Sequence, residues 1–514
     1  MSNQFGAKAM FRSALLSTGS TYVVYAAGLV TSMLIARGLG PADYGRYAYL
    51  VWLSGMLVLL MNHGLTTSAI RFVSESLGRE SRVDAQDVHR RLQRWQGWSL
   101  LIVGLVFLAA LPALRPAGWE GHLTLFAAVA LLASFSKAWY LFSISVAKGY
   151  GRFGIEASSV SLLSLINLAG AGVMALLGSP LSGYMVLFLV ISIAHPLMAA
   201  RQLRRADIHK GKREIDEELL ARVKPHLAWT MVSTLVATFS NKAIETYLLN
   251  HMAGAEAVGF FTIAATLTRG GVDLLSSGLM TVLMPVLANA YGAGGEKRIH
   301  RLGSDAVRYF HFLGLLLTGI GFFWARPVIE LTYGPRYAPA IFALQMMVLV
   351  RGVTLSYAAF GALLTVTDNQ RLRAAEAGFA IVASAGMALW LVPTHGLDGA
   401  IYAHMVSTLA VFCFTFVCVR RVLRMPLPVG DLLRMNAAAV SAALLCFGVL
   451  SLSPTPSVLH QLLVGVLYLI VYLIATLIFK VWNQNDLAMV QKIGQRVPAL
   501  QRLVFLMVPW ARQV

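Results

Sequence analysis

Charged side chains are scarce in this sequence. Only 13% of its 514 residues are Asp, Glu, Lys or Arg and 57% are hydrophobic, whereas about a quarter of the residues in an ordinary soluble domain are charged. The mean hydropathy of +0.68 agrees with this count. The composition therefore excludes a soluble globular fold and predicts an all-α polytopic membrane protein. The net charge of +19 then comes from basic loops that orient the chain, and we expect no nucleic-acid partner.

Cysteine and the motifs of soluble enzymes are also rare or absent. The three cysteines, Cys413, Cys418 and Cys446, lie inside apolar runs and form no disulfide framework. The sequence contains no G-x-x-x-x-G-K-S/T loop, no His and Cys at zinc-binding spacing, no G-x-S-x-G and no Asp-x-Asp pair. We therefore expect no enzyme activity, no catalytic residues, no metal and no cofactor.

Long apolar runs fill most of the chain. A membrane-spanning helix needs about 20 mainly apolar residues, and fourteen such runs are centred near Tyr25, Leu53, Val103, Ser134, Ile166, Leu189, Leu235, Leu267, Leu317, Arg351, Ala383, Ala410, Leu444 and Leu469. Lys and Arg gather in alternate loops and in both tails, so the positive-inside rule places those loops and both termini in the cytoplasm. Arg213–Val223 and the tail from Leu487 to Val497 are amphipathic; they either lie along the inner membrane surface or form a solvated linker and tail.

An internal repeat relates the two halves of the chain. GPADYG at Gly40–Gly45 and GAEAVG at Gly254–Gly259 share a glycine spacing, and the same offset of 214 pairs many further positions. Six spans fit in one repeat, so the two halves enter the membrane in the same direction, as in transporters with parallel repeats. In such transporters the substrate site lies near the middle of the membrane, between the halves.

The repeat predicts five segments. Residues 1–205 form an N-terminal lobe of helices 1–6, residues 206–224 a cytoplasmic linker, and residues 225–425 a C-terminal lobe of helices 7–12. Residues 426–482 add helices 13 and 14, and residues 483–514 form a cytoplasmic amphipathic tail.

Six charged residues lie deep in the predicted spans: Lys137, Lys242, Glu245, Arg269, Asp273 and Arg351. A Lys, Arg or Asp at a helix centre costs roughly 2.5 to 3.5 kcal/mol on insertion scales, so an offsetting interaction is needed. One explanation is pairing along the helix, because Lys242 and Glu245 are three residues apart and Arg269 and Asp273 four apart. Against it, the first repeat has uncharged residues at the equivalent positions, namely Gly28, Thr31, Gly55 and Leu59. Packing alone therefore does not require these charges.

Neither Lys137 nor Arg351 has an acidic residue within one helical turn of it in its own span. They are 214 residues apart, so we expect them to be equivalent and to face each other between the lobes. The pairs Glu156-Ala157 and Glu376-Ala377 suggest an offset of 220 farther on, which shifts this equivalence. Snorkelling to the surface or a partner on another span are the alternative explanations.

Four cations therefore stand against two carboxylates in the spans. A surplus of positive charge in a low dielectric favours an anionic ligand, above all a phosphate, because Arg offers a planar fork and Lys a compact charge. Glu245 and Asp273 then balance that charge or carry a proton. Gly270-Gly271 either loosen the helix beside Arg269 or allow close helix packing.

The stretches ARGLGPADYGRYAYL (36–50) and GLTTSAIRFVSESLG (64–78) resemble the opening of bacterial Wzx-type polysaccharide flippases. These belong to the multidrug/oligosaccharidyl-lipid/polysaccharide (MOP) exporter superfamily. The resemblance implies a two-lobed carrier in the bacterial inner membrane that moves an undecaprenyl-pyrophosphate-linked oligosaccharide by alternating access. Membrane lipid and a polymerase of the same pathway are the implied partners.

The resemblance also implies that basic cavity residues hold the diphosphate. Lys137, Lys242, Arg269 and Arg351 are the candidates by position, with Arg37 and Arg71 at the rim. A lipid II flippase would bind the same diphosphate and stays an alternative. A MATE-type cation or drug antiporter should instead have surplus carboxylates, and a membrane polymerase should have a large external loop.

Overall fold

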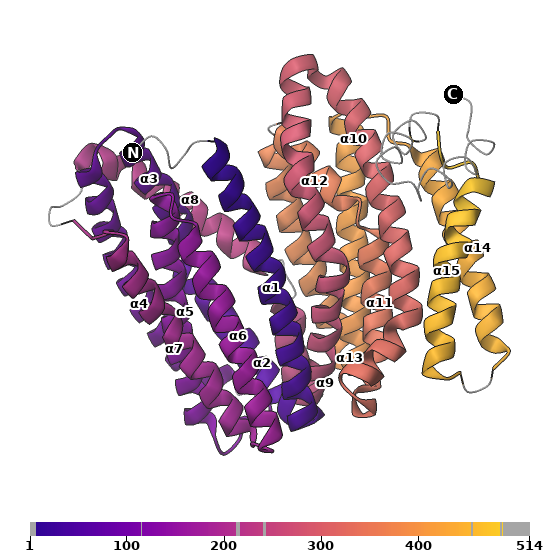
Figure 1. Ribbon diagram of the computed structural model, residues 1–514, viewed down its shortest axis with the longest axis horizontal. Coiled ribbons are helices and arrows are strands. Elements are labelled where there is room, and N and C mark those ends of the chain that lie inside the picture. The colour runs from indigo at the N-terminus through magenta and orange to yellow at the C-terminus, as the bar shows by residue number, and fades with distance from the viewer. Residues whose placement is uncertain are drawn as a thin grey trace. The chain divides into compact units, whose positions relative to one another are not determined.

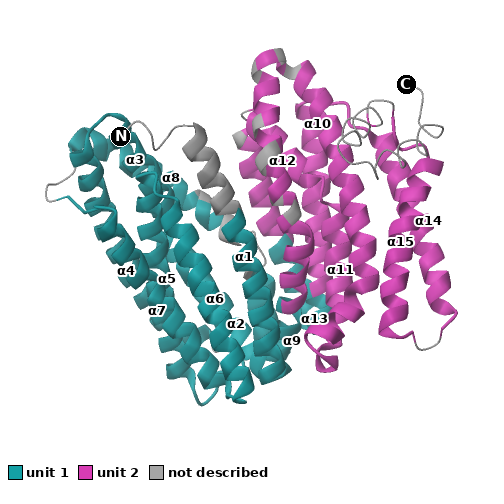
Figure 2. Ribbon diagram, in the orientation of Figure 1, with its two compact units in different colours: residues 1–262, 384–400 teal, residues 263–383, 401–514 magenta. Residues whose placement is uncertain are grey.

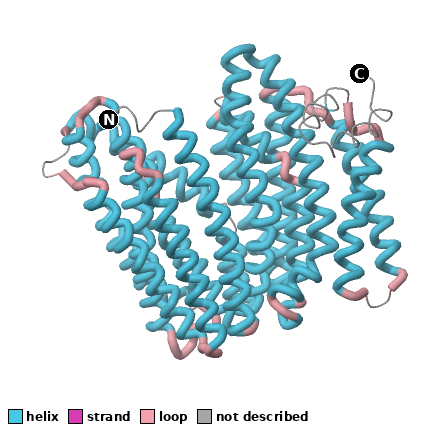
Figure 3. Tube along the Cα trace, viewed as in Figure 1, coloured by secondary structure: helices cyan, strands magenta, loops and turns pink. Residues whose placement is uncertain are grey.

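The structure is a computed structural model that describes residues 7–114, 116–211, 216–239, 243–367, 369–453, 456–483 and 486. Within these residues every element of regular secondary structure is a helix (Figure 3). The predicted all-α membrane fold is therefore confirmed. Packing divides the chain into two compact units, Met1–Thr262 with Ser384–Ala400 as unit 1, and Ile263–Ala383 with Ile401–Val514 as unit 2 (Figure 2).

Unit 1 contains the helices of the first repeat and the start of the second (Figure 1). Its helices are α1 (Ala7–Leu39), α2 (Pro41–Asn62), α3 (Leu65–Gly78), α4 (Arg82–Leu114), α5 (Leu123–Gly149), α6 (Gly154–Leu176), α7 (Leu181–Arg205), α8 (Glu217–Phe239) and most of α9 (Ala243–Thr268). One core cluster joins α3, α4, α5 and the end of α7, and Val223 of α8 is buried in it. Leu219 and Leu220 pack against the same cluster. The described part of the predicted amphipathic linker thus forms the start of α8 and packs against α3, α4 and α5 within unit 1.

Unit 2 holds the remaining elements: the π-helical turn η1 (Arg269–Asp273), α10 (Leu274–Thr332), the short 3-10 turn η2 (Pro335–Tyr337), α11 (Pro339–Val353), α12 (Tyr357–Val366), most of α13 (Gln370–Val422), α14 (Val429–Ser451) and α15 (Val458–Ile478). The last two helices pack on α10, where Tyr468 and Tyr472 of α15 donate hydrogen bonds to the carbonyls of Leu315 and Phe312 at 3.1 and 3.2 Å. Arg308 of α10 adds an ion pair to Asp486 at 2.8 Å.

Three very long helices contain glycine breaks. Gly254 in α9, Gly295 in α10 and Gly396 in α13 have φ of 86°, 59° and 54°, in the left-handed region that glycine adopts without strain. An unbroken α13 of 53 residues would be about 80 Å long, far longer than the roughly 30 Å hydrocarbon core. Gly396 therefore divides α13 into two spans, and Gly295 divides α10 in the same way.

The count of spans is lower than the fourteen expected. Eleven described helices are long and apolar enough to cross a membrane, or twelve if the pair α11 and α12, bent by 42°, is one span. This count takes Arg371–Val422 as a single helix, although Gly396 divides it. The seventh predicted span, near Leu235, runs into residues 240–242, which lie outside the described residues. The total of fourteen stays a prediction.

The internal repeat is visible in the backbone. Gly40 and Gly254, equivalent at offset 214, have φ of 77° and 86° and each separates two helical segments. The second glycines of the two motifs touch: an added Cβ at Gly259 would lie 3.2 Å from Cα of Gly45, and one at Gly45 would overlap the carbonyl oxygen of Ala255. Equivalent positions of the two repeats thus meet inside unit 1.

A loop between α4 and α5 strengthens this contact. Asn250 of α9 accepts a hydrogen bond from the backbone N–H of Ala117 at 2.9 Å, and its amide group donates one to the Ala117 carbonyl at 3.4 Å. Asn250 is buried, and so is Trp119, which stacks on Phe126 at 4.9 Å. The two hydrogen bonds between Asn250 and Ala117 therefore connect the start of the second repeat to the first repeat.

Two ion pairs connect helix ends of unit 1, one between α4 and the residue pair after α7 and one between α3 and α8. Arg82, at the start of α4, donates to the Asp207 carboxylate at 2.6 Å, directly after α7, and this bond holds the pKa of Asp207 below its usual range. Arg222 of α8 pairs with Glu75 of α3 at 2.7 Å and, with Arg79 and Arg71 nearby, lowers the pKa of Glu75. Both pairs are solvent-accessible, so water and salt screen them and each contributes little to stability.

Candidate functional site

Two of the predicted site residues form an ion pair in unit 2. The Arg351 guanidinium donates through Nη2 and Nε to Oδ1 of Asp273 at 2.7 and 3.1 Å. The two side chains are 33% and 32% exposed, so neither is sealed in the core. The partner of Arg351 lies on another helix, and the predicted pairing of Asp273 with Arg269 along one helix is not what these contacts show.

The pair joins two irregular helix segments. Asp273 ends the π-helical turn η1, Arg269–Asp273, and Arg351 lies in the last turn of α11, just before the break that separates it from α12. Gly270 and Gly271 explain the π-helix, because glycine lowers the cost of leaving α-helical geometry. The glycine pair therefore loosens the helix beside Arg269, one of its two predicted effects.

Two predicted cations have no partner within the described parts of the chain. Arg269 of η1 and Lys137 of α5 are both exposed, and neither makes a hydrogen bond or an ion pair there. Lys137 interacts electrostatically with His195 of α7, whose ring packs edge-on against Tyr140 at 4.8 Å. Lys137 belongs to unit 1 and Arg269 to unit 2. Both ammonium and guanidinium groups are thus available to an anion.

Among the predicted site residues that the structure describes, Glu245 of α9 is the most buried, at 1% exposure. Its Oε1 accepts a hydrogen bond from Ser384 of α13 at 2.6 Å, and both residues belong to unit 1. Its Oε2 has no hydrogen-bond partner among the described residues. Lys242, the predicted partner of Glu245, lies outside the described residues.

The two rim candidates lie at different helix ends of unit 1. Arg71 of α3 is exposed; its Nη1 donates to Nδ1 of His226 at 2.8 Å, and its guanidinium carbon lies 5.2 Å from the centroid of the Phe72 ring. Arg37 is exposed in the last turn of α1. The acceptor for Arg71 Nη1 is thus an imidazole nitrogen and not a carboxylate.

Helix boundaries change the predicted equivalence of Lys137 and Arg351. α5 begins at Leu123 and α11 at Pro339, an offset of 216, and α5 ends at Gly149 and α12 at Val366, an offset of 217. At 217 the equivalent of Arg351 is Ser134, a buried serine that donates to carbonyls of α2 and of its own helix. The offset grows because the chain breaks between α11 and α12, whereas α5 continues without a break at the equivalent place. Lys137 and Arg351 are therefore not matched residues of the repeat.

Sequence reasoning missed one buried acid. Glu376 of α13 is 6% exposed and accepts a hydrogen bond from the hydroxyl of Tyr357 on α12. In the sequence, Glu376 stands out only through the pair Glu376-Ala377, which resembles Glu156-Ala157. Its place seven residues inside an apolar helix is the signal that could have revealed it. With Glu376, three carboxylates stand against the four cations.

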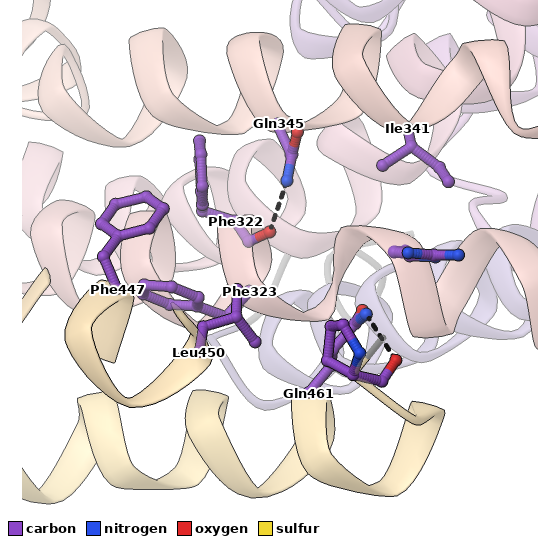
Figure 4. Close-up of a pocket in the computed structure, with 9 residues that line it drawn as sticks. Phe322, Phe323, Ile341, Gln345, Phe447, Leu450 and Gln461 are labelled. Atoms are coloured by element: carbon purple, nitrogen blue, oxygen red, sulfur yellow. Dashed lines mark hydrogen bonds between the residues drawn. The ribbon is translucent and has the colours of Figure 1, made fainter. Parts of the chain in front are cut away.

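A small pocket in unit 2 is lined by none of these charged residues. Its volume is about 210 Å³, and it lies among α10, α11, α14 and the start of α15. Phe322, Phe323 and Phe447 form its wall, and Gln345 donates to the carbonyl of Phe322 at 3.4 Å (Figure 4). Arg326, at the edge, is paired with Glu330 at 2.7 Å. The pocket is apolar and contains none of the predicted site residues.

Comparison with solved structures identifies the fold. The chain is similar to the lipid II flippase MurJ in its inward closed conformation, with a TM-score of 0.71 at 17% identity over 91% of this chain and 98% of that chain. It is also similar to an inward-facing MATE transporter of the MOP superfamily, with a TM-score of 0.64 at 16% identity over 78% and 94%. A MATE transporter of Vibrio cholerae gives 0.56 at 14% identity over 82% and 97%. The protein is a polytopic membrane protein with this fold.

The family follows from the sequence. Residues 10–290, more than half of the chain, match the family described as polysaccharide biosynthesis protein. The chain belongs to this family, which agrees with the resemblance carried by residues 36–50 and 64–78. No curated protein matches the chain.

Proposed function

We propose that the protein is a flippase that moves undecaprenyl-pyrophosphate-linked oligosaccharide units across the bacterial inner membrane, for exopolysaccharide or O-antigen synthesis. Family membership and the fold shared with a lipid II flippase and MATE transporters support a transporter. The observation that carries the cargo class is the pair of exposed span cations, Lys137 and Arg269, that have no acid partner in the described residues. Such groups are retained in a membrane where they bind an anion.

The proposed cycle uses alternating access. The basic loops and both termini face the cytoplasm, and the headgroup enters from that side while the prenyl tail stays in lipid. We assign diphosphate binding to the span cations, Lys137 of unit 1 and Arg269 of unit 2, and Arg351 becomes a further candidate when it leaves Asp273. Lys242 and the rim residues Arg37 and Arg71 add positive charge. The cargo leaves on the outer side and passes to a polymerase of the same pathway.

Coupling is assigned to the acidic residues. Glu245 has one carboxylate oxygen that no described residue contacts, and Asp273 exchanges its partner when Arg351 binds cargo. Either a proton on these groups or the membrane potential drives the cycle; the potential contributes about 2.3 kcal/mol per charge per 100 mV.

Neutralising the unpaired cations tests the proposal. In cells that depend on this protein, Lys137→Gln and Arg269→Gln should leave lipid-linked repeat units in the inner leaflet, where an impermeant lectin added to spheroplasts cannot reach them. Lys148→Gln on the same helix α5 is the matched control, because Lys148 is already paired with Glu156 at 2.7 Å. Full lectin access in both variants would contradict the proposed role of the cations.

The same assay separates the other functions. Units that reach the lectin but stay unpolymerised would identify a membrane polymerase. Normal units combined with loss of resistance to cationic drugs would identify a MATE-type antiporter. Extracted lipid that carries the cell-wall disaccharide-peptide would identify a lipid II flippase.

A further inference from the structure

The two halves of the molecule contain the same tyrosine hydrogen bond with different acceptors. In the first repeat the hydroxyl of Tyr140 on α5 lies 2.8 Å from Oγ of Ser159 on α6. In the second repeat the hydroxyl of Tyr357 on α12 donates to the carboxylate of Glu376 on α13. In each case the partners are 19 residues apart, and both partners shift by 217, the offset of the surrounding helix ends.

This comparison shows what helix packing requires at this position. A neutral serine is sufficient to satisfy the tyrosine in the first repeat, where Ser159 is fully buried and also bonds the Ile155 carbonyl at 2.7 Å. The carboxyl group in the second repeat adds an ionisable group that the joint itself does not need. Burying an unpaired carboxylate is costly, and taking up a proton removes that cost.

The surroundings of Glu376 leave one oxygen open. Its Oε1 accepts from Tyr357, while Oε2 is buried and has no hydrogen-bond partner among the described residues. Arg373 on its own helix donates instead to the Gly361 carbonyl at 2.9 Å and to Thr365 at 2.7 Å. Arg351 interacts electrostatically with Tyr357, and its own ion pair is with Asp273. Among the described residues, Cys418, which follows Gly396 in α13, also interacts electrostatically with Glu376.

We propose that Glu376 is a proton-binding site that controls how α12 packs on α13. The proton adds to Oε2 and converts the carboxylate to a carboxylic acid, while Tyr357 donates to Oε1 in both states. The neutral form suits the buried position. The ionised form needs water at Oε2, so losing the proton opens the joint between the two helices. A metal ion is a poorer occupant, because no group of three or more His, Cys, Asp or Glu side chains is found together in the described residues.

The ionisation is tested on the purified full-length protein in lipid vesicles, without any transported cargo. The infrared carbonyl band of a protonated carboxyl group should be present at low pH and fade as the pH rises, and Glu376→Gln should remove that component. Glu245→Gln and Asp273→Asn should keep it. Tyr357→Phe removes the donor to the ionised form, so the band should persist to higher pH. Tyr140→Phe, the equivalent change in the first repeat, should leave the band unchanged.

The opening of the joint is tested with the protein's own thiol. In a Cys413→Ser, Cys446→Ser background, Cys418 is labelled with a membrane-permeable maleimide, and each rate is divided by that of the same protein with Glu376→Gln. The ratio should rise with pH by up to about tenfold per pH unit, following the ionised fraction of Glu376. With Cys413 as the single cysteine the ratio should stay flat.

Two results would overturn the proposal: a titrating band that survives Glu376→Gln, or a Cys418 ratio that does not change with pH. Because neither readout involves cargo, the proton site fails or stands separately from the proposed flippase function.

Discussion

At the scale of single residues, the contact between Glu245 and Ser384 is the most sharply testable. Ser384→Ala removes the described donor to a buried carboxylate, which should cost about 1 to 3 kcal/mol of unfolding free energy. Glu245→Gln should be close to neutral, because an amide oxygen accepts the same hydrogen bond without a buried charge. Thermal unfolding in one detergent compares the two. A Glu245→Gln protein less stable than Ser384→Ala would mean that the charge itself is needed for folding.

The pair of Arg351 and Asp273 leads to a prediction about ligand binding. Asp273→Asn weakens the ion pair of Arg351, whose side chain is 33% exposed. The guanidinium is then free for an anion. We expect tighter binding of pyrophosphate, measured by calorimetry on the purified protein, by about tenfold for roughly 1.4 kcal/mol of released competition. Arg351→Gln should weaken binding, and Asp273→Asn combined with Arg351→Gln should behave like Arg351→Gln alone. A gain that persists in the double variant would exclude competition for Arg351.

These residues also show the limit of sequence reasoning at this scale. Position in an apolar run is enough to select Lys137, Arg269, Asp273 and Arg351 as exceptional. The pairing of Asp273 with Arg351 is set by a tertiary contact between helices, so spacing along one helix favours the wrong partner for Asp273. Glu376 was missed although its place inside the α13 segment is visible in the sequence, because its contact with Tyr357 of α12 is tertiary.

At the scale of helices, we expect the π-helical turn η1 to lower stability and to support transport. An added Cβ at Gly271 meets nothing within 4 Å, so Gly271→Ala fits sterically and favours regular helix by about 1 kcal/mol. We expect a higher midpoint of thermal unfolding together with slower export of lipid-linked units in the lectin assay, because π-helical turns are frequent at functional sites.

Gly55→Ala is the matched control for η1. Gly55 is equivalent to Arg269 at offset 214, lies in the regular helix α2 and also has open space around its Cα. It should raise stability by a similar amount and leave export unchanged. Equal loss of export in both variants would indicate that general rigidity, and not the π-helical turn, limits transport.

Helix positions are well predicted by apolar runs, and their breaks by glycine. Gly40 and Gly254 open the second helix of each repeat, and the Gly270-Gly271 pair coincides with the π-helix. The sequence indicates a larger offset for the later helices, but the predicted value of 220 is wrong: the helix ends give 216 and 217, and Glu376 is equivalent to Ser159 and not to Glu156. The exact value depends on where α11 breaks, and Thr354 to Ser356 give no turn signal in the sequence. Side-by-side contacts of Gly45 and Gly259 also require the folded chain.

At the scale of the whole molecule, the repeat brings equivalent glycines of two helices into contact inside unit 1. A methyl group at Gly45 would overlap the Ala255 carbonyl, which is backbone and cannot rotate away. Gly45→Ala should therefore force α2 and α9 apart at a cost of about 1 to 3 kcal/mol. In the proposed alternating-access cycle we expect the two repeats to move against each other at this contact, so export of lipid-linked units should fall in the lectin assay as well.

Gly28→Ala on α1 separates this effect from a general response to added methyl groups, since an added Cβ at Gly28 meets nothing within 4 Å. It should keep both export and the unfolding midpoint near those of the unchanged protein. Gly259→Ala should act like Gly45→Ala but more weakly, because its Cβ would lie 3.2 Å from Gly45 and needs only a small shift. If Gly45→Ala unfolds at the normal temperature and exports normally, the two repeats do not rely on this glycine contact, and the transport cycle must close elsewhere.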